Sequence, residues 1–401
     1  MRILFAPLPR APHLYFVAPL AWACRAAGHE VRIAAPPDLT EAVVRAGLTP
    51  AEIGAGPRAA EPAAPTAPGG RPATPGLLAE ASDDERRRLL DLRFAPLVDT
   101  AVRTAPDLVR FAEHWRPQLV VADPMAFAAP LAAAALDIPL LRHLTGPDIM
   151  HRTHNPMHGP TTGDEYTPNW PTGLAELYAE FGAAIRDDYA SGSIDPWPGS
   201  VQVPDAPARI PVRFVPYDGA AAAPDRTPEP SGRPRVCVSW GERGEPDGGA
   251  GEAPVLTRVL DALAARDVDV VLTGSGIDRV RHRPLPDRIR LADDLPLHAV
   301  VPACGAVISE GGTNTILTAA SFGVPQVLLP LVERPPNAAN FCESGAGITL
   351  SGTGADTEAI GAAVDSVLAD GGIRAAARKM RDEIAAAPSP ADLVRTLEEL
   401  A

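Results

Sequence analysis

Short apolar runs alternate with helix-length segments along the first half of this 401-residue chain. The apolar runs predict strands, and the segments that follow them predict helices. The predicted strands are residues 3–7, 30–34 and 119–122, and the predicted helices are residues 17–27, 39–46 and 127–136. This alternation predicts an α/β fold with a parallel, doubly wound sheet, whose ligands bind at the carboxyl ends of the strands.

A second series of apolar runs begins at residue 235, after a stretch rich in proline and alanine. Its predicted strands are residues 235–239, 268–272, 289–291, 305–308 and 326–329. A chain of this length suits two cores better than one. We therefore predict a first domain over residues 1–215, a linker over 216–234, a second domain over 235–387 and an amphipathic final helix within 388–401.

Two segments of the first half lack hydrophobic periodicity and are predicted to be loops. Residues 55–76 are rich in Pro, Gly and Ala, a composition that predicts a mobile loop. Residues 148–173 carry Pro, Thr, His and Asn near the end of a strand. Long loops at that edge of a sheet usually line a binding site, so we expect the second loop to contact a ligand.

Composition and charge exclude several classes of protein. With 46% hydrophobic and 21% charged residues, the chain has the composition of an ordinary globular protein. Its net charge of −14 argues against nucleic-acid binding, because phosphate backbones need a basic surface. No apolar run suits a membrane span, and the N-terminus lacks the apolar region of a signal peptide. The scattered cysteines predict reduced thiols and a cytoplasmic location.

The sequence SEGGTNT at residues 309–315 joins a predicted strand to a predicted helix. Gly311 and Gly312 in such a turn let a phosphate approach the backbone, and the N-terminus of the helix favours an anion. The loop after the next strand adds polar side chains that suit sugar hydroxyls, namely Glu333, Arg334 and Asn337. This half of the chain is therefore predicted to hold a sugar diphosphate.

Two motifs carry a family resemblance, LPLHAVVPACGAVISEGGTNT at residues 295–315 and GVPQVLLPLVERPPNAANFCESGAG at residues 323–347. They closely resemble the donor site of GT-B nucleotide-sugar glycosyltransferases, above all the actinobacterial enzymes that attach deoxysugars to natural products. The pattern of those enzymes is PLxALLPxCxxxVHHGGxGT followed by GVPQxxxPxxxDQxxNAxxxxxxGAG. Further blocks in the same order, such as RFVPYDG at residues 213–219, extend the resemblance over nearly the whole chain.

The resemblance implies two Rossmann-like domains that face a central cleft. The first would bind the acceptor, the second would bind the nucleotide sugar, and the final helix would pack back on the first. The implied reaction is an inverting transfer of a deoxysugar from a dTDP-sugar to a hydrophobic, polyketide-like acceptor of antibiotic biosynthesis, with no metal or other cofactor. Some relatives need a cytochrome-P450-like helper protein. The sequence leaves that helper and a homodimer open.

Two residues are candidates for acid–base chemistry. His13 follows the first predicted strand on a proline-rich loop, six residues before Pro19, and the resemblance implies that it deprotonates the acceptor hydroxyl. A surface loop histidine is the alternative. Asp123 follows the strand at 119–122, where it can hold the imidazole of His13 or can cap the next helix.

Two pairs of residues depart from the family's donor pattern. Ser309 and Glu310 replace two histidines, the second of which contacts the pyrophosphate in the family, while Glu333 and Arg334 replace the usual Asp and Gln. Like charges 4 Å apart repel by about 4 kcal/mol at an effective dielectric of 20, so we expect Glu310 to turn outward or to meet a cation. The other donor-site candidates are Ser239, Gly241, Thr273, Gly274, Leu295, Leu297, Gly311, Gly312, Thr313, Asn314, Thr315 and Asn337.

The acceptor is expected to meet aromatic, histidine and acidic side chains of the first domain. These candidates are Tyr15, Phe16, Asp148, His151, His154 and Trp170. The spacing of His151, His154 and His158 would suit a metal, but Asn155–Pro156 breaks any helix that could align them. We therefore predict no metal site.

Three other functions compete with a glycosyltransferase. The strongest is a non-catalytic helper or binding protein on the same fold, with a donor site degraded at Ser309 and Glu310. A nucleotide-sugar epimerase can share the architecture but needs no acceptor loop. A dehydrogenase is excluded because no GxGxxG follows the first strand.

Overall fold

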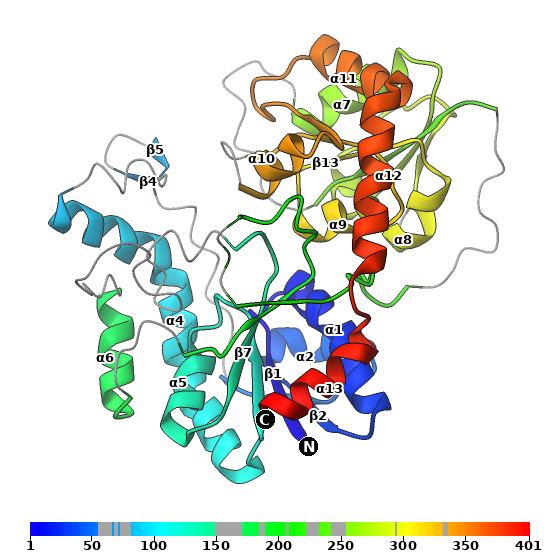
Figure 1. Cartoon of the computed structure of the whole chain (residues 1–401). Helices are drawn as coiled ribbons and strands as arrows, with labels where there is room; N and C mark the ends of the chain where they lie inside the picture. The colour runs from blue at the N-terminus through cyan, green and yellow to red at the C-terminus, as the bar shows by residue number, and fades with distance from the viewer. Residues whose placement is uncertain are drawn as a thin grey trace. The chain divides into compact units, whose positions relative to one another are not determined.

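The computed structural model describes residues 1–54, 66–67, 71–72, 82–148, 171–183, 189–204, 206, 208–221, 232–241, 254–292, 295–331 and 336–401. The chain divides into two compact units (Figure 1). Unit 1 comprises Met1–Asp195, Asp205–Val212 and Pro388–Ala401, and unit 2 comprises Pro196–Pro204 and Arg213–Ala387. The chain thus passes between the units at four places, and the first residues of the predicted linker belong to unit 2.

Unit 1 is built on a parallel sheet with the strand order β3-β2-β1-β6-β7-β8-β9. Its strands are β1 (Arg2–Ala6), β2 (Glu30–Ala35), β3 (Pro50–Glu52), β6 (Leu119–Ala122), β7 (Leu140–His143), β8 (Ser193–Asp195) and β9 (Arg209–Pro211). Its helices are α1 (Ala11–Ala26), α2 (Pro37–Arg45), α4 (Asp83–Trp115), α5 (Ala128–Leu136), α6 (Thr172–Glu180) and α13 (Pro390–Leu400). Leu4 and Ala6 of β1 share a core with α4, α5 and α6.

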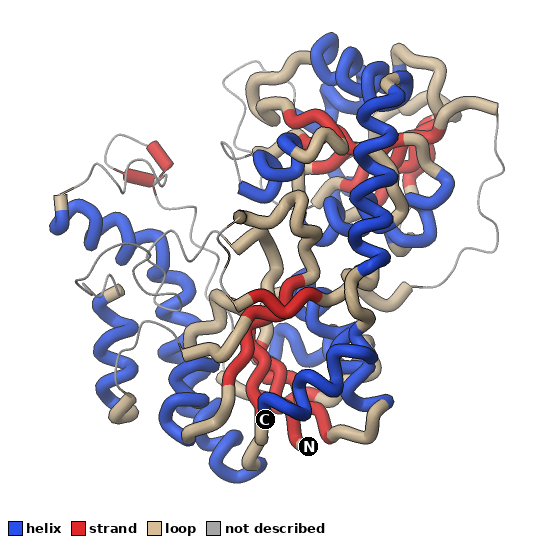
Figure 2. The backbone as a smooth tube through the Cα atoms, in the orientation of Figure 1, coloured by secondary structure: helices blue, strands red, loops and turns tan. Residues whose placement is uncertain are grey.

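Unit 2 is built on a second parallel sheet, with the order β12-β11-β10-β13-β14-β15. Its strands are β10 (Arg235–Ser239), β11 (Asp269–Thr273), β12 (Ile289–Leu291), β13 (Ala306–Ser309), β14 (Gln326–Leu328) and β15 (Gly347–Thr349). Its α-helices are α7 (Val255–Ala264), α8 (Leu297–Val300), α9 (Thr313–Ser321), α10 (Pro336–Glu343), α11 (Thr357–Ala369) and α12 (Gly371–Ala386). Helices accompany the strands in both units (Figure 2), and the predicted doubly wound α/β class is confirmed.

Each sheet has a switch point where the strand order reverses. In unit 1 the chain moves outward from β1 through β2 to β3 and then restarts at β6 on the other side of β1. In unit 2 the same reversal lies between β10 and β13. Ligands of doubly wound sheets bind at such points, beside the carboxyl ends of the two strands.

The first helix begins earlier than predicted. The sequence pattern predicted a helix over residues 17–27, whereas α1 spans Ala11–Ala26, so that His13 lies in its first turn and not on a loop. Pro12 is compatible with that turn, because a backbone N–H there would have no partner within the helix. Most of the other predicted elements are shifted by one or two residues.

The 33-residue helix α4 was not predicted. The antiparallel pair β4 (Thr66–Ala67) and β5 (Arg71–Pro72) lies within the predicted loop at 55–76, and the rest of that loop lies outside the described residues. Most of the second predicted loop, residues 149–170, lies outside them too. No helix in the described part of the chain has both the length and the apolarity to cross a membrane.

The final helix α13 belongs to unit 1, where it packs against α1. At the end of α1, His29 Nε2 lies 3.1 Å from a carboxylate oxygen of Glu398 on α13. Within the predicted linker, Asp218 accepts a hydrogen bond from the Leu297 N–H at the start of α8. Its second oxygen lies 3.1 Å from His298 Nδ1, so Asp218 holds the entry to unit 2 against α8.

Candidate active site

His13 and Asp123 meet at the switch point of unit 1. Strands β1 and β6 are neighbours, with Ala6 opposite Ala122, and the Asp123 N–H donates to the Ala6 carbonyl at 3.0 Å. His13, in the first turn of α1, places Nδ1 2.6 Å from Asp123 Oδ2. Two residues 110 positions apart in the sequence are therefore joined by a short, charge-assisted contact.

The second oxygen of Asp123 is also engaged. Oδ1 accepts a hydrogen bond from the Met125 N–H at 2.8 Å, and the side chain is only 1% exposed. The alternative role as a helix cap is wrong, because α5 begins at Ala128 and its N-cap is Phe127. Asp123 instead closes the turn between β6 and α5, and this turn fixes the orientation of its carboxylate toward His13.

This geometry sets the hydrogen-bonding roles of the imidazole. An ionised carboxylate only accepts hydrogen bonds, so His13 donates through Nδ1–H and keeps a lone pair on Nε2. Nε2 is then the nitrogen that can accept a proton, with the carboxylate of Asp123 on the opposite side of the ring. The His13 side chain is 17% exposed, so the pair has limited contact with solvent.

A second histidine near Asp123 was not predicted. His143 ends β7, beside β6, where Arg142 is opposite Ala122. Burial lowers the pKa of His143 from 6.5 to about 4, and the negative charge of Asp123 opposes that shift only partly. His143 is therefore neutral near pH 7. Its position after an apolar run could have indicated a strand end, but no bounds were predicted for the strand before the loop at 148–173.

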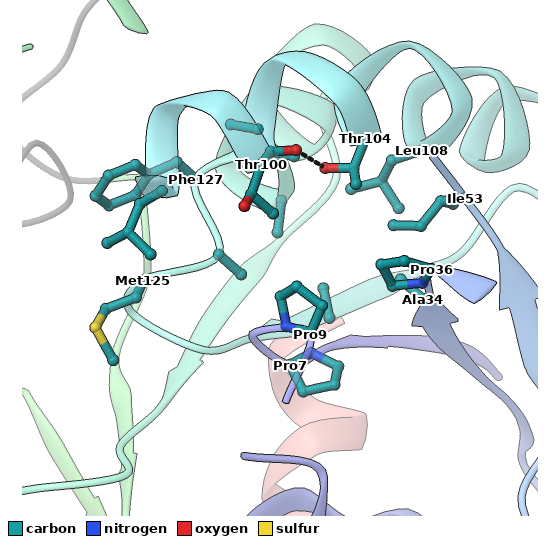
Figure 3. A pocket seen from close by; sticks show the side chains of 16 residues that line it. Pro7, Pro9, Ala34, Pro36, Ile53, Thr100, Thr104, Leu108, Met125 and Phe127 are labelled. Atoms are coloured by element: carbon teal, nitrogen blue, oxygen red, sulfur yellow. Dashed lines mark hydrogen bonds between the residues drawn. The ribbon is translucent and has the colours of Figure 1, made fainter. Parts of the chain in front are cut away.

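Unit 1 also holds a small apolar pocket of about 30 Å³, to which Met125 and Ala126 of the turn after Asp123 contribute (Figure 3). It is lined from several elements by Ala6, Pro7, Pro9, Ala34, Pro36, Ile53, Leu97, Thr100, Ala101, Thr104, Leu108, Met125, Ala126, Phe127, Ala128 and Ala129. The hydroxyls of Thr100 and Thr104 donate to carbonyls one turn earlier in α4, so they offer the pocket mostly their apolar parts. The lining of the pocket is therefore mostly apolar, and its volume is about that of one or two water molecules.

The predicted acceptor residues are only partly described. Phe16 is buried in α1 at 5% exposure, Tyr15 is half-buried, and Asp148 is 2% exposed. None of the three lines the apolar pocket. His151, His154 and Trp170, together with His158, lie outside the described residues.

The predicted diphosphate turn lies at the switch point of unit 2. After β13, Gly311 adopts a left-handed φ of 80°, and Gly312 is the N-cap of α9 without a side-chain cap. Thr313, Asn314 and Thr315 form the first turn of α9, and the backbone N–H groups at the start of an α-helix suit an anion. The predicted strand–glycine–helix geometry is present, and the binding of a diphosphate there stays a prediction.

Three side chains hold this turn and the strand beside it. Ser309 Oγ accepts from the Gly311 N–H at 3.2 Å, and Asn337 Nδ2 donates to the Gly311 carbonyl at 2.6 Å. Glu310 Oε2 accepts from the Gly241 N–H at 2.8 Å. Asn337, predicted to meet the sugar, thus has a backbone partner in the diphosphate turn. Glu333 and Arg334 lie outside the described residues.

The other predicted donor residues gather along the same edge of the sheet. Ser239 is opposite both Thr273 and Ser309 in the strand register. Thr273 Oγ1 donates to the Leu295 carbonyl at 3.3 Å, and Leu297 is buried at the start of α8. Gly274 has a φ of 95°, and a Cβ there would lie 2.3 Å from the Trp240 carbonyl oxygen, so only glycine fits.

Comparison with known proteins gives matches over nearly the whole chain. Residues 22–241 match the family model described as erythromycin biosynthesis protein CIII-like, N-terminal domain, and residues 257–400 match the corresponding C-terminal domain. The 10-deoxymethynolide desosaminyltransferase of Streptomyces venezuelae is 33% identical, with 100% of this chain and 97% of that protein covered. The TDP-daunosamine transferase DnrS of Streptomyces peucetius is 35% identical, with the same coverage.

Solved structures give the same picture. The spinosyn rhamnosyltransferase SpnG complexed with thymidine diphosphate has a TM-score of 0.78 and 32% identity, covering 99% of this chain and 100% of that one. The glycosyltransferase VinC in complex with dTDP has a TM-score of 0.79 and 28% identity, covering 100% of this chain and 99% of that one.

Proposed function

The chain belongs to the erythromycin biosynthesis protein CIII-like family of GT-B glycosyltransferases, as its motifs predicted, and from this premise we propose its reaction. It transfers a deoxysugar from a dTDP-sugar to a hydrophobic, polyketide-like acceptor with inversion at the anomeric carbon. His13 is the general base. The observation that carries this proposal is the 2.6 Å contact between His13 Nδ1 and Asp123 Oδ2 at the switch point of unit 1.

In the proposed step, an acceptor hydroxyl gives its proton to Nε2 of His13. The oxygen attacks the anomeric carbon from the side opposite the diphosphate, and the C–O bond to the diphosphate breaks. One in-line displacement inverts the configuration. The buried carboxylate of Asp123 supports the base because it lies beside the positive charge that forms on the imidazole.

The proposed donor site is the turn at Gly311 and Gly312. Its support is the start of α9, whose N–H groups suit the charge that the leaving diphosphate gains. Two structural relatives, SpnG and VinC, are described as complexes with thymidine diphosphate or dTDP. We assign the nucleobase to the rim at Leu295 and Leu297, beside Thr273.

The proposed acceptor class rests on the family resemblance and on the names of relatives. SpnG is also described in complex with spinosyn aglycone, and other relatives are named for 10-deoxymethynolide and aklavinone. We propose further that no metal is needed and that the chain acts in the cytoplasm. The sequence left the P450-like helper and the homodimer open. Transfer by the purified chain alone tests the need for a helper, and the mass of the chain in solution tests the dimer.

The test is a transfer assay with the purified full-length chain. A panel of dTDP-deoxysugars is offered with macrolactone and anthracyclinone aglycones, and the product's anomeric configuration is read by NMR. We expect one pair to give a glycoside of inverted configuration. A product with retained configuration would contradict the single displacement. Tight dTDP binding without transfer, combined with stimulation of another transferase, would instead favour the non-catalytic helper.

A further inference from the structure

Glu310 reaches sideways from the loop after β13 to the loop after β10. The two strands are paired, with Ser309 opposite Ser239, so the loops that leave them begin side by side. Glu310 Oε2 accepts a hydrogen bond from the Gly241 N–H at 2.8 Å. The carboxylate at the family's histidine position is therefore bonded to the backbone of the neighbouring loop.

Gly241 is suited to this contact by its lack of a side chain. A Cβ at this position would lie 3.0 Å from Glu310 Oε2, closer than ordinary van der Waals contact. The preceding residue is held from the other side, because the Trp240 N–H donates to the Thr273 carbonyl and the Trp240 carbonyl accepts from the Gly276 N–H, each at 3.0 Å. The hydrogen bond from the Gly241 N–H thus ties the loop after β10 to the residue that follows β13.

The diphosphate turn itself is held by other groups. Ser309 Oγ and Asn337 Nδ2 bond the N–H and the carbonyl of Gly311. Loss of the Glu310 carboxylate would consequently release Gly241 and leave the Gly311–Gly312 turn in place. A substitution at Glu310 should therefore alter the loop after β10 without altering the Gly311–Gly312 turn.

We propose that Glu310 is a positioning residue for donor binding, and that it acts as a hydrogen-bond acceptor for Gly241 rather than through its charge. The inference rests on the proposed function, since it concerns the pocket of the dTDP-sugar. It follows that the diphosphate is held by the N–H groups that follow Gly312 and by the hydroxyls of Thr313 and Thr315. Residue 310 then makes no direct contact with the diphosphate.

The test measures the affinity of the full chain for dTDP by calorimetry. Glu310→Gln keeps an acceptor oxygen, so we expect affinity within about threefold of the wild type. Glu310→Ala removes the acceptor and should weaken binding by about five- to thirtyfold. Gly241→Ala crowds Oε2 and should weaken binding too. The double variant should be no weaker than Glu310→Ala alone, because both changes remove one contact.

Two matched controls accompany these variants. Glu358→Ala removes an exposed carboxylate from α11 of the same unit, and Gly371→Ala adds a Cβ that meets nothing within 4 Å. Both should bind dTDP like the wild type. Thermal unfolding of every variant identifies a folding defect. If Glu310→Ala fails to fold, Glu310→Gln and Gly241→Ala still decide the question.

Several outcomes would overturn the proposal. If Glu310→Gln and Glu310→Ala both bind dTDP more tightly, repulsion between the carboxylate and the diphosphate governs the site. If Glu310→Gln is as weak as Glu310→Ala, the charge is needed. If all variants equal the wild type, Glu310 positions nothing. Failure of the wild-type chain to bind dTDP would instead refute the proposed donor, which distinguishes the two failures. In turnover, Glu310→Ala should raise the donor KM more than it lowers kcat.

Discussion

Replacing Asp123 by Asn should abolish most transfer without disturbing the turn that holds the residue. The side-chain oxygen of Asn can still accept from the Met125 N–H, now 2.8 Å from Asp123 Oδ1. Its NH2 group then faces His13 Nδ1, where a carboxylate oxygen now lies at 2.6 Å. A donor there makes Nδ1 an acceptor and puts the ring proton on Nε2. Nε2 can then no longer take the proton of the acceptor hydroxyl.

The magnitude follows from two losses. The variant has the wrong tautomer, and it lacks a buried negative charge beside the imidazolium. General-base catalysis is worth about 10²–10⁴-fold, so we expect kcat to fall by that factor. This corresponds to about 3–5 kcal/mol in activation free energy. Because the tautomer is set by the amide and not by titration, raising the pH should not restore the rate.

The assay is a single-turnover measurement with saturating donor, beside dTDP binding by calorimetry. His13→Ala should lose a similar factor, and both variants should keep the dTDP affinity, since the proposed donor residues belong to unit 2. Asp137→Asn is the matched control, because it makes the same change at an exposed left-handed position that Asn tolerates. If the transfer rate of Asp123→Asn is within about threefold of the wild-type rate while His13→Ala is inactive, the base works without Asp123. Activity in both variants would refute the base assignment itself.

Three further predictions concern pH, backbone and metal. The pKa of His143 is lowered to about 4 in the fold, so the unfolded chain binds more protons between pH 4 and 6.5. The free energy of unfolding should therefore be highest above pH 6.5 and should fall by about 3 kcal/mol as the pH drops to 4. Urea titrations of His143→Gln should show a smaller loss over the same pH range. Gly274→Ala should cost about 3 kcal/mol or more in free energy of unfolding, whereas Gly232→Ala, with a φ of 88° and open space around its Cβ, should cost about 1–2 kcal/mol. Saturating chelator should leave the transfer rate unchanged, and a rate restored only by a divalent ion would contradict the metal-free reaction.

The strands were the elements that the sequence predicted best. Leu119–Ala122, Arg235–Ser239 and Ile289–Leu291 have the predicted bounds. The first two are buried over most of their length, and strands of a sheet covered on both faces read as short apolar runs. Strands β8 and β9 have three residues each and leave no such run, so they were missed.

Helix α4 was missed because Pro96 and Pro106 lie inside it, where prolines normally end a helix. A local signal was present. Ser82 and Glu85 form a capping box, with the Ser82 hydroxyl accepting from the Glu85 N–H and the Glu85 carboxylate accepting from the Ser82 N–H. Missing α4 also concealed the part that Thr100 and Thr104 play in the apolar pocket.

The sequence could place His13 and Asp123 near strand ends, but it could not show that they touch. That contact depends on β1 and β6 being neighbours, which strand–helix alternation does not determine. Gly241 and Glu310 depend in the same way on β10 and β13. At each switch point two adjacent strands lead to connections that run to opposite sides, so no crossover helix covers the gap between them. A side chain just after one strand can then reach a group that follows the other, as Asp123 and Glu310 do. Both candidate sites therefore follow from one topological feature, which is repeated in the two sheets. In a sequence of this fold, contacts between distant segments should be sought first among the residues that follow the two strands of a switch point.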